Sequence, residues 1–123
     1  MKIGIAGIGA IGLNVALSLD RQESPGFQLA GFSARSKDRA AQFNDMLSLP
    51  IKHYGFAELA QNCDIIIECL PPQLFKKIAI PVLKAGKILI DLSASQLLKY
   101  DHLIDLAEEY GGQIIVPSGA MLG

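Results

Sequence analysis

Two runs of apolar residues restrict the fold of this chain more than any other feature of its sequence. Residues 64–70 and 87–92 carry isoleucine, leucine and other apolar side chains at successive positions rather than at alternate ones. A strand with one face in solvent alternates between apolar and polar residues, whereas a strand buried on both faces does not. We therefore predict two central strands of a parallel sheet that is covered by helices on both faces.

Weaker apolar runs and helical patterns alternate along the rest of the chain. Further strands are predicted at residues 3–6, 28–33, 50–53 and 113–116. Helices are predicted between the strands, at residues 10–19, 37–46, 56–61, 72 to about 86, and 96–110. Such alternation is typical of α/β proteins with right-handed crossovers. The expected fold is a Rossmann-type doubly wound parallel sheet of about six strands in the order 3-2-1-4-5-6, with residues 1–123 forming one domain.

Individual residues are expected to delimit these helices. Ser36 is a candidate N-cap for the second helix, and Ser95 for the last one. Pro72 suits the first turn of the fourth helix, and Pro81 is expected to kink that helix. The pair Gly111-Gly112 is expected to end the last helix.

A glycine-rich segment follows the first predicted strand and opens the first predicted helix. Its sequence, Gly7-Ile8-Gly9-Ala10-Ile11-Gly12, has the G-x-G-x-x-G spacing of dinucleotide-binding loops. Gly7 would allow the tight turn, Gly9 the approach of a pyrophosphate, and Gly12 the close packing of helix on strand. The helix N-terminus would offer its N–H groups to the anion. The alternative interpretation is a glycine-rich turn without a ligand.

The tip of the second predicted strand lies about 20 residues beyond this loop, where dinucleotide-binding proteins contact the adenosine ribose. The sequence there carries no acidic residue to accept hydrogen bonds from a ribose 2′-hydroxyl. Ser33, Arg35 and Ser36 instead supply donors and a positive charge suited to a phosphate, and Lys37 and Arg39 would add to that field. We therefore predict NADP as the preferred cofactor, with NAD as the other. Taken alone, Arg35 would be interpreted as a solvated loop residue.

Three segments follow predicted strands at the edge where ligands bind in open α/β sheets. Leu70, Pro71 and Pro72 follow the fourth strand, Ser93 follows the fifth, and Ser118-Gly119 follows the sixth. Small side chains and backbone amides suit a flat nicotinamide ring, and the two prolines restrict their loop to one shape. Two interpretations of Ser93 stay open, namely helix capping and contact with the ligand.

Titratable and sulfur-containing side chains give weaker indications. Glu68 is interpreted either as an isolated buried acid or as a strand-end residue near the ribose. Cys63 and Cys69 are expected to be buried, reduced thiols, as a reducing cytoplasm would allow. His53 and His102 are far apart in sequence and complete no metal-binding spacing, so no metal is predicted.

Composition and charge narrow the classes of partner. The chain has 11 basic and 12 acidic residues, a formal net charge of −1 and no long run of either sign. A broad nucleic-acid surface is therefore not expected. The N-terminal apolar stretch is too short for a transmembrane helix and lacks a convincing signal-cleavage pattern. We expect a cytoplasmic protein whose partner is a dinucleotide, without nucleic acid or membrane.

Three segments of this chain together resemble the L-aspartate dehydrogenase family. They are Gly7-Ile8-Gly9-Ala10-Ile11-Gly12, Glu68-Cys69-Leu70-Pro71-Pro72 and, most specifically, Val116-Pro117-Ser118-Gly119-Ala120. The resemblance covers essentially the whole chain. It implies reversible oxidative deamination of L-aspartate with NADP or NAD, a reaction that feeds NAD biosynthesis in some organisms. It also implies that Ala10 and Ile11 contact the pyrophosphate, and that Ser118 and Gly119 lie near the nicotinamide and the substrate.

The chain departs from that family in its length. In the family, a second α+β domain follows this segment and carries the catalytic histidine and much of the aspartate pocket. This chain ends at Gly123, and neither His53 nor His102 matches that histidine. We therefore assign no catalytic residue. The chain alone is expected to bind the dinucleotide and to turn over very little, since a small amino-acid substrate would need the second domain.

Two other functions stay open beside this one. The chain is alternatively the cofactor domain of a homoserine dehydrogenase-like enzyme or of a related amino-acid or semialdehyde dehydrogenase. In a different class, it is a stand-alone dinucleotide-binding module that regulates a partner. The apolar tail at residues 120–123 is expected to drive self-association into a homo-oligomer.

Overall fold

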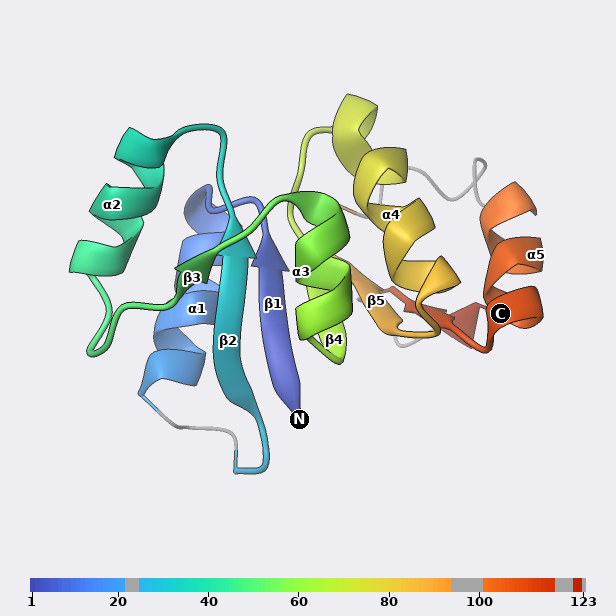
Figure 1. Cartoon of the computed structure of the whole chain (residues 1–123), viewed down its shortest axis with the longest axis horizontal. Helices are drawn as coiled ribbons and strands as arrows, with labels where there is room; N and C mark the ends of the chain where they lie inside the picture. The colour runs from blue at the N-terminus through green and yellow to red at the C-terminus, as the bar shows by residue number, and fades with distance from the viewer. Residues whose placement is uncertain (22–24, 94–100, 117–120, 123) are drawn as a thin grey trace.

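The computed structural model describes residues 1–21, 25–93, 101–116 and 121–122 (Figure 1). These residues contain a seven-stranded sheet. Its strands are β1 (Lys2–Ala6), β2 (Gln28–Ser33), β3 (Lys52–His53), β4 (Ile65–Glu68), β5 (Ile88–Asp91), β6 (Gln113–Ile115) and β7 (Met121–Leu122). The helices are α1 (Ala10–Asp20), α2 (Lys37–Asp45), α3 (Phe56–Asn62), α4 (Phe75–Lys84) and α5 (Asp101–Tyr110), and a 3-10 turn at Pro72–Leu74 precedes α4.

The strands follow the order β3-β2-β1-β4-β5-β6-β7 across the sheet. The first six are parallel, which confirms the predicted order 3-2-1-4-5-6 and the Rossmann-type fold. The last strand was not predicted. Met121–Leu122 pairs with β6 in the antiparallel direction, so this part of the tail extends the sheet.

The sheet separates two hydrophobic clusters. Figure 1 shows α3, α4 and α5 in front of the sheet and α1 behind it. One cluster joins α3, α4 and α5 to the sheet, and the other joins α1 and α2 to the opposite face. Helices therefore cover both faces of the sheet, as predicted.

The packing of β4 on both faces of the sheet explains why its sequence is apolar at successive positions. Ile65, Ile66 and Ile67 are all buried. Ile66 belongs to the cluster under α3 and α4, whereas Ile65 and Ile67 belong to the cluster on the opposite face. Successive side chains of a strand point to opposite faces, so only a strand covered on both sides accommodates this run.

One helix start differs from the sequence prediction, whereas the kink at Pro81 and the cap at Ser95 stay predictions. Pro72 opens a 3-10 turn rather than the helix itself, which begins at Phe75. Pro81 lies inside α4, and the helix continues through it to Lys84. The described part of the last helix begins at Asp101, and the predicted cap Ser95 lies outside the described residues.

Ser36 caps α2 as predicted. Its Oγ accepts a 3.2 Å hydrogen bond from the backbone N–H of Arg39, and its backbone is extended, as N-cap residues require. The helix then continues to Asp45, and its buried side chains Ala40 and Phe43 pack into the cluster shared with α1. This cap therefore fixes where the chain leaves the tip of β2.

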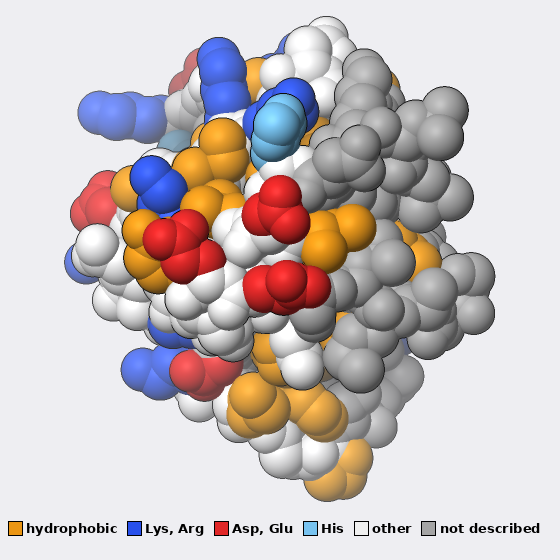
Figure 2. Space-filling view, turned by 90° about the vertical axis from the view of Figure 1, so that its right-hand side faces the viewer, with side chains coloured by type: hydrophobic (Ala, Val, Ile, Leu, Met, Phe, Trp, Pro, Cys, Tyr) orange, Lys and Arg blue, Asp and Glu red, His pale blue; other side chains and the backbone are white. Residues whose placement is uncertain are grey.

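The α5 side of the molecule carries charges of both signs. Figure 2 shows acidic side chains in the middle of this face and basic ones along its upper edge. Asp105, Glu108 and Glu109 of α5 are exposed. Among the described residues, no helix is long and apolar enough to cross a membrane.

Candidate functional site

A pocket of about 420 Å³ opens at the carboxyl ends of β1, β2 and β4. The chain leaves β1 and β4 toward opposite faces of the sheet, and ligands of open α/β sheets bind at such a place. The predicted site residues that line the pocket are Gly7, Gly9, Ser33, Arg35, Leu70 and Pro71. The other lining residues are Ile8, Ala34, Arg39, Phe56, Cys69 and Leu74.

The three glycines of the loop meet different local constraints. Gly7 has a φ of +91°, and a Cβ there would lie 2.8 Å from the carbonyl oxygen of Cys69. At Gly12, a Cβ would overlap the carbonyl oxygen of Gly7, so α1 packs directly against the turn. A Cβ on Gly9 would meet no atom within 4 Å. The first and third glycines are therefore required by packing, whereas the second borders open space.

The first turn of α1 faces solvent at the pocket. Gly9 is the N-cap and provides no side chain to satisfy the N–H groups of this turn. Ala10 and Ile11 are exposed, although they do not line the pocket itself. The helix also has no acidic residue in its first turn, so its partial positive charge is not offset there.

The tip of β2 brings a buried hydroxyl next to two arginines. Ser33 is 4% exposed, and its Oγ has no hydrogen-bond partner within the described structure. Arg35 and Arg39 are exposed and line the same pocket. Arg39 extends from the first turn of α2, where Ser36 caps the helix and stays outside the pocket lining. The tip therefore presents one unsatisfied polar atom and two positive charges.

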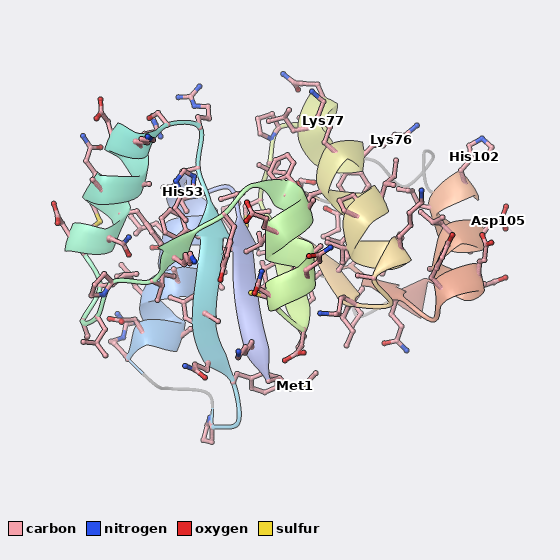
Figure 3. The ribbon with its side chains drawn as sticks, in the orientation of Figure 1. Met1, His53, Lys76, Lys77, His102 and Asp105 are labelled. Atoms are coloured by element: carbon pink, nitrogen blue, oxygen red, sulfur yellow. The ribbon has the colours of Figure 1, made fainter. Side chains whose placement is uncertain are left out.

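His53 supports this tip from the neighbouring strand. Its ring stacks on Phe32 with centroids 5.2 Å apart, and its Nε2 lies 3.2 Å from both the N and the O atom of Ala34. Figure 3 shows His53 and His102 on opposite sides of the molecule. His53 therefore holds the backbone beside Ser33, and the two histidines do not act together.

An apolar wall completes the pocket on the side of β4. Leu70 and Pro71 contribute to it, together with Phe56 at the start of α3 and Leu74 before α4. Pro72 is exposed and stays outside the lining. Phe56 and Leu74 were not predicted as site residues, because apolar residues in helical patterns are usually interpreted as core.

A free cysteine belongs to the same wall. Both cysteines are free thiols, as predicted, but only Cys63 is buried; Cys69 is half-buried because it lines the pocket. Burial, together with the nearby carboxyl groups of Glu68 and Asp91, raises the pKa of Cys69 to about 12. Burial also raises the pKa of Cys63. The Cys69 thiol therefore stays protonated at neutral pH, and it contributes an apolar surface rather than a nucleophile.

Ser93 lies outside the pocket lining, with its hydroxyl between two acids. Its Oγ is 2.6 Å from Oε1 of Glu68 and 2.7 Å from Oδ1 of Asp91. Glu68 is fully buried, yet it is not the isolated acid that one interpretation of the sequence suggested. Burial and the hydrogen bond with Asp91 raise the pKa of Glu68 to about 8. Asp91 was not among the predicted site residues, although an acidic residue at the end of an otherwise apolar strand indicates a polar site there. Ser118 and Gly119 lie outside the described residues.

Comparisons with known proteins agree with this geometry. The family model of the homoserine dehydrogenase NAD-binding domain matches residues 7–117. Over its whole length, the chain is 40% identical to L-aspartate dehydrogenase 3 of Bordetella bronchiseptica and covers 45% of that protein. It is also 35% identical to the L-aspartate dehydrogenase of Bradyrhizobium diazoefficiens and covers 43% of it. The chain thus spans less than half the length of these relatives.

Solved structures share the fold. Biliverdin reductase from Synechocystis, in complex with biliverdin and NADP+, superposes with a TM-score of 0.79 at 25% identity, over 94% of this chain and 37% of that one. The family model of the homoserine dehydrogenase NAD-binding domain matches far more than half of the chain. The glycine loop, the strand order and the position of the pocket are those of dinucleotide-binding domains. This chain therefore belongs to the family of homoserine dehydrogenase NAD-binding domains, and throughout its length it resembles L-aspartate dehydrogenase.

Proposed function

We propose that this chain is the cofactor domain of an enzyme similar to L-aspartate dehydrogenase, and that it binds NADP in preference to NAD. The observation that supports the preference is the buried hydroxyl of Ser33, which has no partner in the described structure and lies beside two arginines. The orphaned hydroxyl and the open space at Gly9 fit a dinucleotide with a phosphorylated ribose.

The ribose end of the site carries the preference. A 2′-phosphate takes charge-assisted hydrogen bonds from arginine, often two at once, and a serine hydroxyl adds a donor. We assign these contacts to Ser33, Arg35 and Arg39. An acid at the strand tip would instead bind a 2′-hydroxyl and repel the phosphate. Among the described residues that line the pocket, none is acidic.

The rest of the dinucleotide is assigned along the same edge of the sheet. The N–H groups of Ala10 and Ile11 receive the pyrophosphate at the start of α1, where no side chain caps the helix. The wall formed by Leu70 and Pro71 faces the more distant part of the cofactor. By resemblance to L-aspartate dehydrogenase, residues 118–119 complete the nicotinamide end.

The reaction we propose is oxidation of the amino-bearing carbon of L-aspartate. The cofactor supplies the hydride acceptor, and this chain binds and orients it. The matched part is 45% of L-aspartate dehydrogenase 3, and we assign amino-acid binding and the catalytic groups to the remainder of such a protein. The chain alone should therefore bind the dinucleotide without aspartate-dependent turnover.

A homoserine dehydrogenase-like enzyme is the second candidate. The family model whose description names homoserine dehydrogenase supports it. The identities of 40% and 35% to two L-aspartate dehydrogenases favour the first candidate. Assaying the full-length protein with L-aspartate and with L-homoserine separates the two, since only the true substrate reduces the cofactor at a useful rate.

Isothermal titration of NADPH and NADH into one preparation tests the cofactor preference. We expect NADPH to bind more tightly. R35A should weaken NADPH binding by about tenfold or more, because one charged hydrogen bond contributes about 1.5–3 kcal/mol. NADH binding should barely change. K84A is the matched control: it removes one exposed positive charge at the far end of α4 and should leave both affinities unchanged.

Two results would contradict the proposal at different levels. Equal affinities, or tighter binding of NADH, would refute the NADP preference but not the assignment of the chain as a cofactor domain. Failure of the isolated chain to bind either dinucleotide would refute its function as a self-sufficient cofactor-binding domain.

A further inference from the structure

Two buried carboxyl groups lie beside the pocket and make none of the proposed cofactor contacts. Glu68 ends β4 and Asp91 ends β5, and the two residues are direct partners in the parallel register. Each is 0% exposed to solvent. Partners on neighbouring strands point to the same side of the sheet, so the two acids meet at its carboxyl edge.

The two carboxyl groups can be hydrogen bonded to each other only while one of them is protonated. One oxygen of each carboxyl group lies 2.6–2.7 Å from the same Ser93 Oγ atom, so the two acids meet at that hydroxyl. Two carboxylates only accept hydrogen bonds, so a direct hydrogen bond between these side chains requires one carboxyl group to be protonated. Ser93 Oγ lies within hydrogen-bond distance of both acids, yet its single hydrogen serves only one of them at a time.

The surroundings favour the protonated form of Glu68. Burial contributes most to raising its pKa to about 8, and the hydrogen bond with Asp91 adds to it. On the other sides, β1 places Ala6 opposite Glu68, and the following loop places Cys69 near it. Among the described residues, no lysine, arginine or histidine contributes to this pKa, so no cation compensates for ionisation.

Glu68 also fixes the loop that forms the pocket wall. Its Oε2 accepts a 2.7 Å hydrogen bond from the backbone N–H of Leu70, which lines the pocket. A Cβ on Gly7 would lie 2.8 Å from the carbonyl oxygen of Cys69 and 3.0 Å from Cδ2 of Leu70. The loop therefore packs against the glycine turn, and a displacement of one displaces the other.

We propose that Glu68, protonated and hydrogen bonded to Asp91, is a positioning residue for the dinucleotide that holds residues 69–71 against the glycine turn. Loss of the shared proton would leave two carboxylates in contact in a buried site, where like charges repel each other strongly. The loop would then move away from the turn. This inference rests on the proposed function. Glu68 acts through Leu70 rather than by contact with the cofactor.

Binding measured against pH tests this positioning role. Between about pH 7 and about pH 9, the wild-type dissociation constants for NADPH and NADH should each rise by about tenfold, because the protonated fraction of a group with a pKa near 8 falls by that factor. E68Q keeps a neutral, hydrogen-bonding side chain, so its affinities should stay flat. E109Q, an exposed substitution on α5, should follow the wild type.

A second variant keeps the test valid if E68Q does not fold. The amide of D91N donates to Glu68 whether or not Glu68 is ionised, so its affinities should fall less with pH than those of the wild type. In the chain without ligand, the carboxyl carbon signal of Glu68 should titrate far above the usual range of glutamate. Exchange of the Leu70 amide hydrogen should accelerate over the same pH range, beyond the intrinsic effect of pH.

The outcomes separate this proposal from the cofactor assignment. Binding whose pH dependence is the same in E68Q, D91N and the wild type would overturn the positioning role and leave the cofactor site intact. An ordinary titration of the Glu68 carboxyl would overturn the role without any dinucleotide. Absence of binding at every pH, with a raised Glu68 titration, would refute the cofactor assignment and the positioning role that depends on it.

Discussion

The contact between Gly12 and Gly7 makes G12A the most informative test of the glycine loop. A Cβ at residue 12 would overlap the carbonyl oxygen of Gly7 and lie 3.3 Å from Cγ2 of Ile5. The first obstacle is backbone, so no change of rotamer relieves it, and α1 must move away from β1. This contact fixes the start of the helix relative to the pocket, so the same substitution should perturb both stability and ligand binding.

The size of the effect follows from two opposing contributions. Overpacking a well-packed interior costs about 1–3 kcal/mol, and a backbone obstacle places G12A at the upper end. The better helix propensity of alanine offsets about 1 kcal/mol of that cost. We therefore expect the free energy of unfolding to fall by about 2 kcal/mol. For a domain of this size, the melting temperature should then fall by about 6–10 °C.

G9A is the matched control for this substitution. A Cβ at residue 9 meets no atom within 4 Å, and the φ of −68° suits alanine. Its loss of stability should stay below about 1 kcal/mol, mainly because alanine is a poorer N-cap than glycine. Dinucleotide binding should nevertheless weaken if the pyrophosphate occupies the open space. Urea unfolding monitored by circular dichroism measures the free energy of unfolding of both variants. Equal stability of G12A and the wild type, or of G12A and G9A, would refute the reasoning.

Three further predictions concern stability and assembly. Glu68 has a folded pKa of about 8, above its ordinary value of 4.5, so the native state holds the extra proton between these values. The free energy of unfolding should fall by up to about 1.4 kcal/mol for each pH unit between about pH 5 and pH 8 and then level off, as urea unfolding of the wild type against E68Q would measure. S36A should lower the free energy of unfolding by about 1 kcal/mol through loss of the α2 cap, and an unchanged urea midpoint would contradict this. We expect homo-oligomers to form through the sheet edge at β7, and sedimentation showing only monomer at rising protein concentration would exclude them.

The fold was largely predictable because its signals are local. The successive apolar residues of β4 identify a strand covered on both faces, and the glycine loop identifies the turn from β1 to α1. Strand β7 was not predictable in the same way. It contains only Met121–Leu122, and its pairing depends on β6 being within reach in three dimensions. Two residues carry no periodicity from which a strand could be inferred.

Within the site, the glycine positions were the most directly predictable, because a backbone requirement leaves a trace in residue type. Gly7 has a positive φ and Gly12 excludes a Cβ, so both positions require glycine. The pairing of Glu68 with Asp91 leaves no such trace, because the two residues are 23 positions apart and meet only through the register of β4 and β5. Glu68 was therefore interpreted without its partner Asp91.

The protonated thiol of Cys69 has a practical consequence for the pocket. Oxidation and alkylation of cysteine proceed through the thiolate, and a pKa of about 12 leaves very little thiolate near neutral pH. The thiol lies in the wall of a pocket assigned to a redox cofactor, yet it should resist peroxide and alkylating reagents. Because the carboxyl groups beside it help to suppress its ionisation, the acid pair also protects the sulfur from damage.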